Sequence, residues 1–408
     1  MRPPRIPLRA LPRIQKLVPR PAAPTSPGIY VGEVPDDARA ISGVATSIAL
    51  FIGWSAEGPA DRAVRIASFA DYERDFGGLD QRSFLGYSVR HFFENGGTDA
   101  YVLRVTGPDG TEWSADDADF RTAVLDSFGP GTITDGIDLF SLLCVPGLTD
   151  PGTIAALQAH CRRRRAFLIV DSPEGAAVSD MEEVLAGLTG PDASHSALYY
   201  PWVSAADPLD QGARRAFPPC GFVAGVYART DASHGVWKAP AGTGAGIAGA
   251  ASLELAVSDA GNAQLNPLGI NCLRAFPPYG PMIWGARTLH GHDARASEWK
   301  YVPVRRMALF LEESLYRGTQ WAANEPNDES LWARIHMGAG AFMQDLYRRG
   351  AFQGRTPREA YFVKCDRETT TQPDVDQGVV NIHVGFAPLK PAEFVVMNLQ
   401  HAAGETVT

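Results

Sequence analysis

Apolar strands and helices alternate regularly through the middle of the chain, and this rhythm constrains the fold more than any other feature. FSLLCVPG at residues 140–147, FLIVDSPEG at residues 167–175 and ALYYPWV at residues 197–203 are typical of buried strands. Helical segments at residues 153–166 and 178–188 separate them. Strands that alternate with helices are joined by right-handed crossovers into a parallel sheet. The sequence therefore predicts an α/β fold in this region.

The first part of the chain predicts further strands and helices. Residues 46–55 and 100–105 are apolar enough to form buried strands. Residues 68–78 predict a short helix, because Ser68 suits the N-cap and an acidic residue follows three positions later. Residues 83–97 predict a second helix, which ends at an Asn-Gly-Gly turn.

The last part of the chain is richer in helix. Two long helices are predicted at residues 304–322 and 329–352. GVVNIHVGFAP at residues 378–388 then alternates apolar and polar positions, which predicts a strand. The fold class expected for the whole chain is therefore α/β with mixed α+β character.

A short alternating strand is predicted at each end of the folded body. PGIYVGEV occupies residues 27–34 and EFVVMNLQ occupies residues 393–400, and neither has a hairpin partner next to it in sequence. A lone strand in water is marginally stable, so each must pair with the body of its own chain or with a neighbouring molecule.

Charge and cysteine content narrow the class of protein. The formal net charge of −9 argues against general nucleic-acid binding, which needs a basic face. The five cysteines include no CxxC pair, which favours reduced, buried thiols over a disulfide scaffold. No apolar run is long enough to span a bilayer.

Residues 1–26 form a separate segment. They contain six basic residues, seven prolines and no acidic residue, and they lack the apolar stretch of a signal peptide. This composition is typical of a flexible, basic, proline-rich extension.

Two motifs suggest ligand binding but lack the context that it requires. Gly244, Gly246 and Gly249 have G-x-G-x-x-G spacing, but no buried strand precedes them and no acidic residue ends a second strand, so a flexible linker is favoured over a cofactor site. His290 and His292 form an HGH pair without a third ligand at structural-site spacing. Neither a cofactor nor a metal is therefore expected.

The middle region leaves an α/β hydrolase open as the alternative from another functional class. Asp171 ends a predicted strand, and His160, His195 and His234 are scattered through the same region. However, no G-x-S-x-G elbow is present, and no spacing places a histidine beside Asp171. A strand-end aspartate more often caps the following turn, so no catalytic residue is predicted.

Several stretches of the chain, in order, resemble the sheath protein of contractile tails, which encloses phage tails, R-type pyocins and extracellular contractile injection systems. The matching stretches are PGIYVGEVPDDARAISGVATSIALFIGWSAEGP, SFADYERDFGGLD, LGYSVRHFFENGGTDAYVLRV, GVWKAPAG, NPLGINCLRAFPPYGPMIWGARTL, WKYVPVRRMALFLEESL and WAANEPNDESLW. The resemblance runs from Pro27 to about Gln400. No single motif is diagnostic, but their common order is specific.

The resemblance implies a domain layout. The N-terminal and C-terminal sections would combine into an inner sheath domain, an inserted subtilisin-like α/β domain would lie between them, and an extended linking arm would lie at each end. The expected boundaries are 1–26 for the basic extension, 27–106 for the N-terminal arm and first part of the inner domain, 107–262 for the insertion, 263–388 for the second part of the inner domain, and 389–408 for the C-terminal arm.

The resemblance also implies a structural function without enzymatic activity. Subunits would polymerise helically around an inner tail tube and contract to drive it through a target envelope, with baseplate and tail-terminator or cap proteins as further partners. Nucleic-acid binding and membrane insertion are not implied. Assembly would occur in the cytoplasm of the producing bacterium, and the finished phage tail-like particle would be released. The modest length favours an injection system, with a contractile phage tail as the alternative.

Two groups of residues are expected to make the intersubunit and tube contacts. The linking arms would use Ile29, Tyr30, Val31, Val34, Phe394, Val395, Val396, Met397 and Leu399. The predicted helix at residues 329–352 would face the tube through Arg334, Arg348 and Arg349, although solvated arginines explain the same pattern equally well. Hinges are expected at the proline junctions at residues 34–35 and 387–391.

Overall fold

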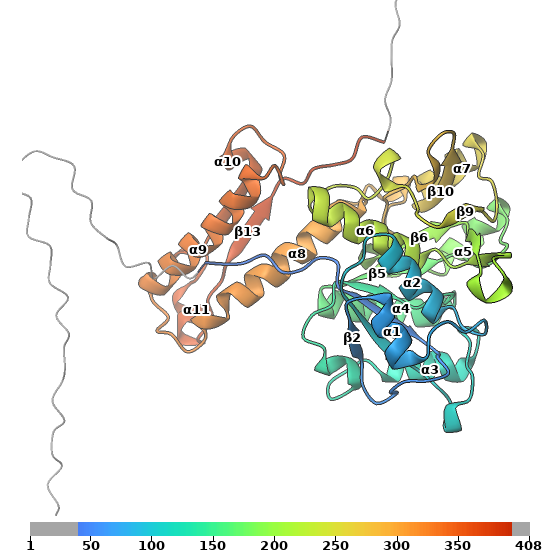
Figure 1. The fold of residues 1–408 in the computed structure, drawn as a ribbon. Helices are drawn as coiled ribbons and strands as arrows, with labels where there is room; N and C mark the ends of the chain where they lie inside the picture. The colour runs from blue at the N-terminus through green and yellow to red at the C-terminus, as the bar shows by residue number, and fades with distance from the viewer. Residues whose placement is uncertain (1–39, 394–408) are drawn as a thin grey trace, which may run out of the picture. The chain divides into compact units, whose positions relative to one another are not determined.

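The computed structural model describes residues 40–393, and the largest sheet within them has eight strands (Figure 1). Six inner strands are parallel, and the two outermost strands are antiparallel to their neighbours. In spatial order the strands are β11 (Gly280–Ile283), β10 (Ile270–Phe276), β6 (Ser196–Tyr200), β5 (Phe167–Asp171), β4 (Leu142–Cys144), β1 (Ala49–Gly53), β3 (Ala100–Arg104) and β2 (Val64–Ile66).

Helices cover both faces of this sheet (Figure 1). In β1, Ala49 and Phe51 belong to one core, and Leu50 and Ile52 belong to the other. A strand buried on both faces is uniformly apolar, which explains the unbroken run at residues 46–55. One face carries α1 (Phe69–Phe76), α2 (Leu85–Glu94) and α6 (Cys220–His234), and the other carries α3 (Ala118–Asp126), α4 (Pro151–Arg164), α5 (Met181–Ala186) and α7 (Asp259–Leu265).

The structure confirms the predicted parallel α/β arrangement and its local signals. The Ser68 hydroxyl accepts a hydrogen bond from the Asp71 amide at 3.2 Å and so caps α1 as predicted. The three arginines in the last turn of α4 lie at the negative end of its dipole. All five cysteines are free and buried, as their spacing indicated.

The expected boundaries at residues 106 and 262 do not separate two bodies of the fold. Strand β1 lies between β3 and β4, so the first section and the expected insertion share one sheet. Strand β10, from the third section, extends the same sheet beside β6. An apolar run predicts that a strand is buried but not which sheet it joins, so the pattern did not reveal this continuity. The subtilisin-like character of the insertion stays a prediction.

The glycine-rich stretch after residue 240 is ordered, whereas the sequence predicted a flexible linker. The amides of Gly242 and Ile247 donate to the carbonyls of Ile283 and Pro281 at 2.9 Å each, along β11. The stretch leads into a three-stranded antiparallel sheet, which consists of β8 (Arg214–Phe217), β7 (Val203–Ala206) and β9 (Ala250–Leu253).

Residues 302–393, here called the C-terminal region, form a smaller helical part with its own core. Met307 and Leu311 of α8 pack with Phe342, Met343 and Leu346 of α9. The elements of this region are α8 (Val302–Thr319), α9 (Glu329–Arg348), α10 (Pro357–Ala360), β12 (Tyr361–Lys364), α11 (Gln372–Asp376) and β13 (His383–Phe386). None of the helices within residues 40–393 is long and apolar enough to cross a membrane.

Candidate assembly surfaces

The C-terminal region presents a sheet of only two strands. Strands β12 and β13 pair antiparallel, with Tyr361 opposite Phe386 and Lys364 opposite His383. Within residues 40–393 no third strand joins them, so each strand has one edge without a strand beside it. Such an edge exposes backbone donors and acceptors that can pair with an added strand.

The two faces of this sheet differ in burial. Tyr361, Val363, Val384 and Phe386 pack against the core of the C-terminal region. On the opposite face the ring of Phe362 is 54% exposed and lies across Gly385, where an added Cβ would overlap it. The open edges, rather than this single exposed ring, mark the sheet as a place where another chain can add a strand.

Helix α9 packs one face on the core and exposes the other. Arg348 and Arg349 are both exposed near its C-terminus, and Arg349 also lies over the Trp237 ring. Arg334 lies toward the other end, where it pairs with Glu325 at 3.2 Å and stacks on Trp321. Arg348 and Arg349 are therefore exposed next to each other. The Arg349 side chain, which also lies 3.9 Å from Asp345, is 58% exposed, whereas that of Arg334 is 27% exposed.

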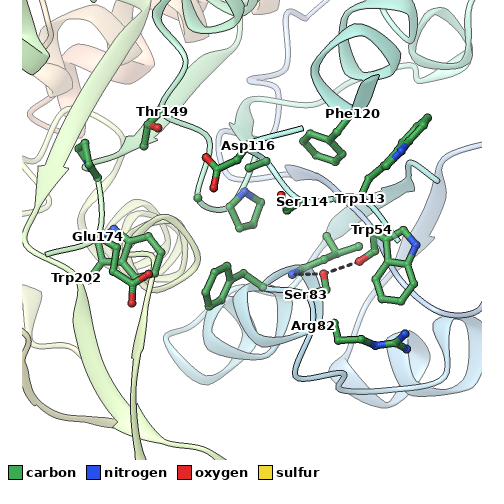
Figure 2. A pocket seen from close by; sticks show the side chains of 17 residues that line it. Trp54, Arg82, Ser83, Trp113, Ser114, Asp116, Phe120, Thr149, Glu174 and Trp202 are labelled. Atoms are coloured by element: carbon green, nitrogen blue, oxygen red, sulfur yellow. Dashed lines mark hydrogen bonds between the residues drawn. The ribbon is translucent and has the colours of Figure 1, made fainter. Parts of the chain in front are cut away.

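A crevice of about 230 Å³ opens where the parallel strands end, the usual place for a ligand in an α/β fold (Figure 2). Glu174 and Trp202 lie on one side of the view, and Trp54 and Trp113 lie on the other. The Ser83 hydroxyl donates to the Trp54 carbonyl at 2.5 Å. No histidine or cysteine is among the described residues that line the crevice, so no nucleophile here has an imidazole base within reach.

Asp171 has a structural role at the end of β5. Its side chain is buried and accepts hydrogen bonds from the amides of Gly147 at 3.0 Å and Cys220 at 2.7 Å. Cys220 begins α6, so the carboxyl group lies at the positive end of a helix dipole. Burial raises the pKa of Asp171 to about 6, and these hydrogen bonds oppose the rise.

The three histidines considered for catalysis have other neighbours. His160 contacts Arg163, the His195 ring lies 2.5 Å from the Arg305 guanidinium, and His234 contacts the adjacent serine. None of the hydrogen bonds found within residues 40–393 joins a histidine to Asp171. The geometry thus gives the hydrolase alternative no support.

The two histidines of the HGH pair contact neighbouring groups of their own loop. His290 contacts the Ser297 hydroxyl, and His292 accepts from the Ala294 amide. No group of three or more ligating side chains in the described part of the chain could hold a metal ion.

Two family models match the chain. The phage tail sheath central domain matches residues 134–289, and the phage tail sheath C-terminal domain matches residues 295–401, so together they cover more than half of the sequence. The chain belongs to the contractile tail sheath family. The amino-acid pattern that suggested this resemblance and the family models thus agree.

Related proteins extend the match over almost the whole chain. This sheath protein is 27% identical over 273 residues to a protein described as a prophage major tail sheath protein of Pseudomonas aeruginosa, with 65% of this chain and 67% of that protein covered. The contracted PVC sheath of an extracellular contractile injection system superposes with a TM-score of 0.74 at 29% identity, covering 94% of this chain and 99% of that one. The contracted helical sheath of the anti-feeding prophage gives 0.73 at 29% identity, with 93% and 100% covered.

The predicted arm residues of this sheath protein lie outside the described residues. They are Ile29, Tyr30, Val31 and Val34 at one end, and Phe394, Val395, Val396, Met397 and Leu399 at the other. The first residue of the expected hinge at 387–391 is held by backbone hydrogen bonds. The Ala387 amide donates to the Ala360 carbonyl at 2.8 Å, and the Ala387 carbonyl accepts from the Gln353 amide at 2.9 Å. The inference from sequence missed β12 altogether, although Tyr361 and Val363 carry the alternation that marks a short strand.

Proposed function

We propose that this sheath protein is the force-generating subunit of an extracellular contractile injection system. Its copies would polymerise helically around an inner tail tube and contract to drive that tube through a target envelope. The observation that carries the proposal is the likeness at 29% identity, over more than nine-tenths of the chain, to the PVC and anti-feeding prophage sheaths. The prophage sheath protein of Pseudomonas aeruginosa matches 65% of this chain at 27% identity, and a tail sheath protein of Vibrio phage KVP40 matches 44% at 24% identity.

Subunits would join by adding strands to the β12–β13 sheet. Its two open edges provide one acceptor for each of the two predicted arms, whose pairing residues lie at positions 27–34 and 394–399. Because the donor and acceptor surfaces differ, the contact is heterologous and extends into a helical array rather than closing as a dimer.

Contraction would change how the bodies of neighbouring subunits pack while the added strands remain paired. The arms then serve as tethers that keep each subunit in the lattice during the movement. Baseplate and tail-terminator or cap proteins would close the two ends of the array. We place assembly in the cytoplasm of the producing bacterium, before release of the particle.

Electron microscopy of the purified full-length protein, alone and coexpressed with the inner tube protein, tests this function. Striated hollow cylinders that contract are the expected result. In particles isolated from the producing bacterium, cylinders attached to DNA-filled heads would instead assign the protein to a phage tail. A protein that stays monomeric under all assembly conditions would contradict a sheath function of either kind.

The exposed end of α9 is proposed to contact the tube. These arginines are expected to meet acidic groups on the tube. We therefore expect the double substitution Arg348→Glu and Arg349→Glu to reduce co-assembly with the tube about tenfold or more, because like charges brought together at an interface are strongly unfavourable. Cosedimentation of sheath and tube protein measures this.

Arg355→Glu with Arg358→Glu is the matched control, because it makes the same change in charge at two exposed positions beyond α9. Equal cosedimentation of both double variants with the tube would show that the arginines of α9 are merely solvated.

A further inference from the structure

Arg287 is a cation enclosed in the fold just after β11. Its side chain is 0% exposed. Its backbone is held on both sides by the buried Asn271, whose Oδ1 accepts from the Arg287 amide and whose Nδ2 donates to the Arg287 carbonyl, at 2.7 Å each. The backbone from which the guanidinium extends is therefore fixed to β10, which contains Asn271.

The guanidinium binds Glu393, the last described residue. Its Nε and Nη2 donate to the two carboxylate oxygens of Glu393, both at 2.6 Å. The hydroxyl of Tyr301 donates to the same carboxylate at 3.2 Å. Such a bidentate pair combines two charge-assisted hydrogen bonds and fixes the relative orientation of the two groups.

A second carboxylate contacts the same arginine from a more exposed position. Asp293 accepts from Nη1 of Arg287 at 3.0 Å and pairs with Lys300 at 2.7 Å. The Asp293 side chain is 47% exposed, whereas that of Glu393 is 17% exposed. Glu393 is thus the partner that balances the charge inside the fold, where an unpaired guanidinium is strongly unfavourable.

The chain before Glu393 is held at its other end as well. Ala387 is hydrogen-bonded to Gln353 and Ala360, and Pro388 forms a bridge with Phe352, so this end belongs to the C-terminal region. Residues 389–393 then line an open cleft of about 620 Å³ together with Trp237 and Trp284. The segment therefore runs from the β12–β13 sheet back to the eight-stranded sheet and is fastened at both ends.

We propose that Arg287 is a positioning residue that clamps Glu393 and so fixes the point from which the C-terminal arm leaves the subunit. The arm residues that are expected to pair with a neighbour begin at the next position, Phe394, and one extended residue spans only about 3.3–3.6 Å, so the clamp leaves almost no slack. The clamp thereby attaches the start of the donor arm to the eight-stranded sheet. The acceptor strands β12 and β13, by contrast, belong to the C-terminal region. The existence of the clamp does not depend on the proposed sheath function. Its effect on assembly does rest on that function.

The substitution Glu393→Gln tests the clamp, because glutamine removes the charge and one of the two hydrogen bonds while leaving the fold's cores untouched. In the unassembled protein we expect proteinase K to cleave within residues 389–393 about ten- to hundredfold faster than in the wild type, since cleavage follows the population of the open segment. Mass spectrometry locates the cut. We expect the concentration needed for tube formation to rise about tenfold or more.

Asp293→Asn is the matched control, because it removes the same charge from the other partner of Arg287 and keeps the bidentate pair. It should be cleaved and should assemble like the wild type. Wild-type cleavage of the Glu393→Gln variant would overturn the clamp, and faster cleavage with unchanged assembly would overturn its positioning role. A wild type that forms no tubes would contradict the sheath function, while the cleavage comparison would still decide whether the clamp exists.

Discussion

A variant that ends at Glu393 is expected to fold normally and to form no tubes. Fixing an arm on a neighbour costs ~1–2 kcal/mol of backbone entropy per residue, and each added hydrogen bond returns ~1 kcal/mol. The balance therefore depends on the apolar side chains, each of which contributes ~1.5–3 kcal/mol when buried. Removing Phe394, Val396 and their neighbours removes the favourable part, so polymerisation should be lost.

Sedimentation and negative-stain microscopy measure this loss. The matched control is a variant that lacks only residues 401–408 and retains the predicted arm, and it should form tubes like the full-length protein. Sheaths of normal length from the variant that ends at Glu393 would be incompatible with an essential C-terminal arm.

Asp231→Ala is expected to lower the unfolding free energy by about 3–5 kcal/mol, because it leaves a buried guanidinium without its counterion. Arg306 of α8 makes bidentate contacts of 2.9 and 2.6 Å with Asp231 of α6, and the two side chains are 3% and 4% exposed. Nη2 of Arg306 also donates to the Thr46 carbonyl at 2.8 Å. The Arg306 guanidinium and its partners connect α8 of the C-terminal region to the part of the chain that contains the eight-stranded sheet. Loss of the ion pair should therefore destabilise both parts.

Thermal unfolding measures the effect, and we expect the apparent Tm to fall by on the order of 10 °C. Asp259→Ala is the control, because the Asp259 side chain is 94% exposed in its pair with Arg274 and such pairs contribute about 0–1 kcal/mol. Similar Tm values for the two variants would show that the Arg306–Asp231 pair contributes little to stability.

Local signals predicted the elements of this fold better than their grouping. The alternation at residues 140–203 predicted β4, β5, β6 and the helices between them, because strand and helix periodicities differ clearly. The sheet continues across the expected boundary at residue 106, because β1 pairs with both β3 and β4, and nothing in the local sequence of these strands indicates which strand lies beside which.

For the assembly surfaces too, the local sequence pattern predicts single elements but not contacts between residues far apart in the chain. The isolated strands at the two ends could be recognised from their alternation, because a lone strand needs a partner wherever it lies. The pair of Arg287 and Glu393 joins residues 106 positions apart, and nothing in either local sequence indicates the other. Likewise, only the fold shows that Arg334 is held by Glu325 while Arg348 remains exposed.

A cryo-EM reconstruction of the assembled sheath tests the central claim most directly, because it shows which molecule supplies each strand of the small sheet. We expect β12 and β13 to be flanked by residues 27–34 and 394–399, both from neighbouring subunits. Arms that return to the sheet of their own subunit, or β12 and β13 edges without added strands in the assembled tube, would contradict the account.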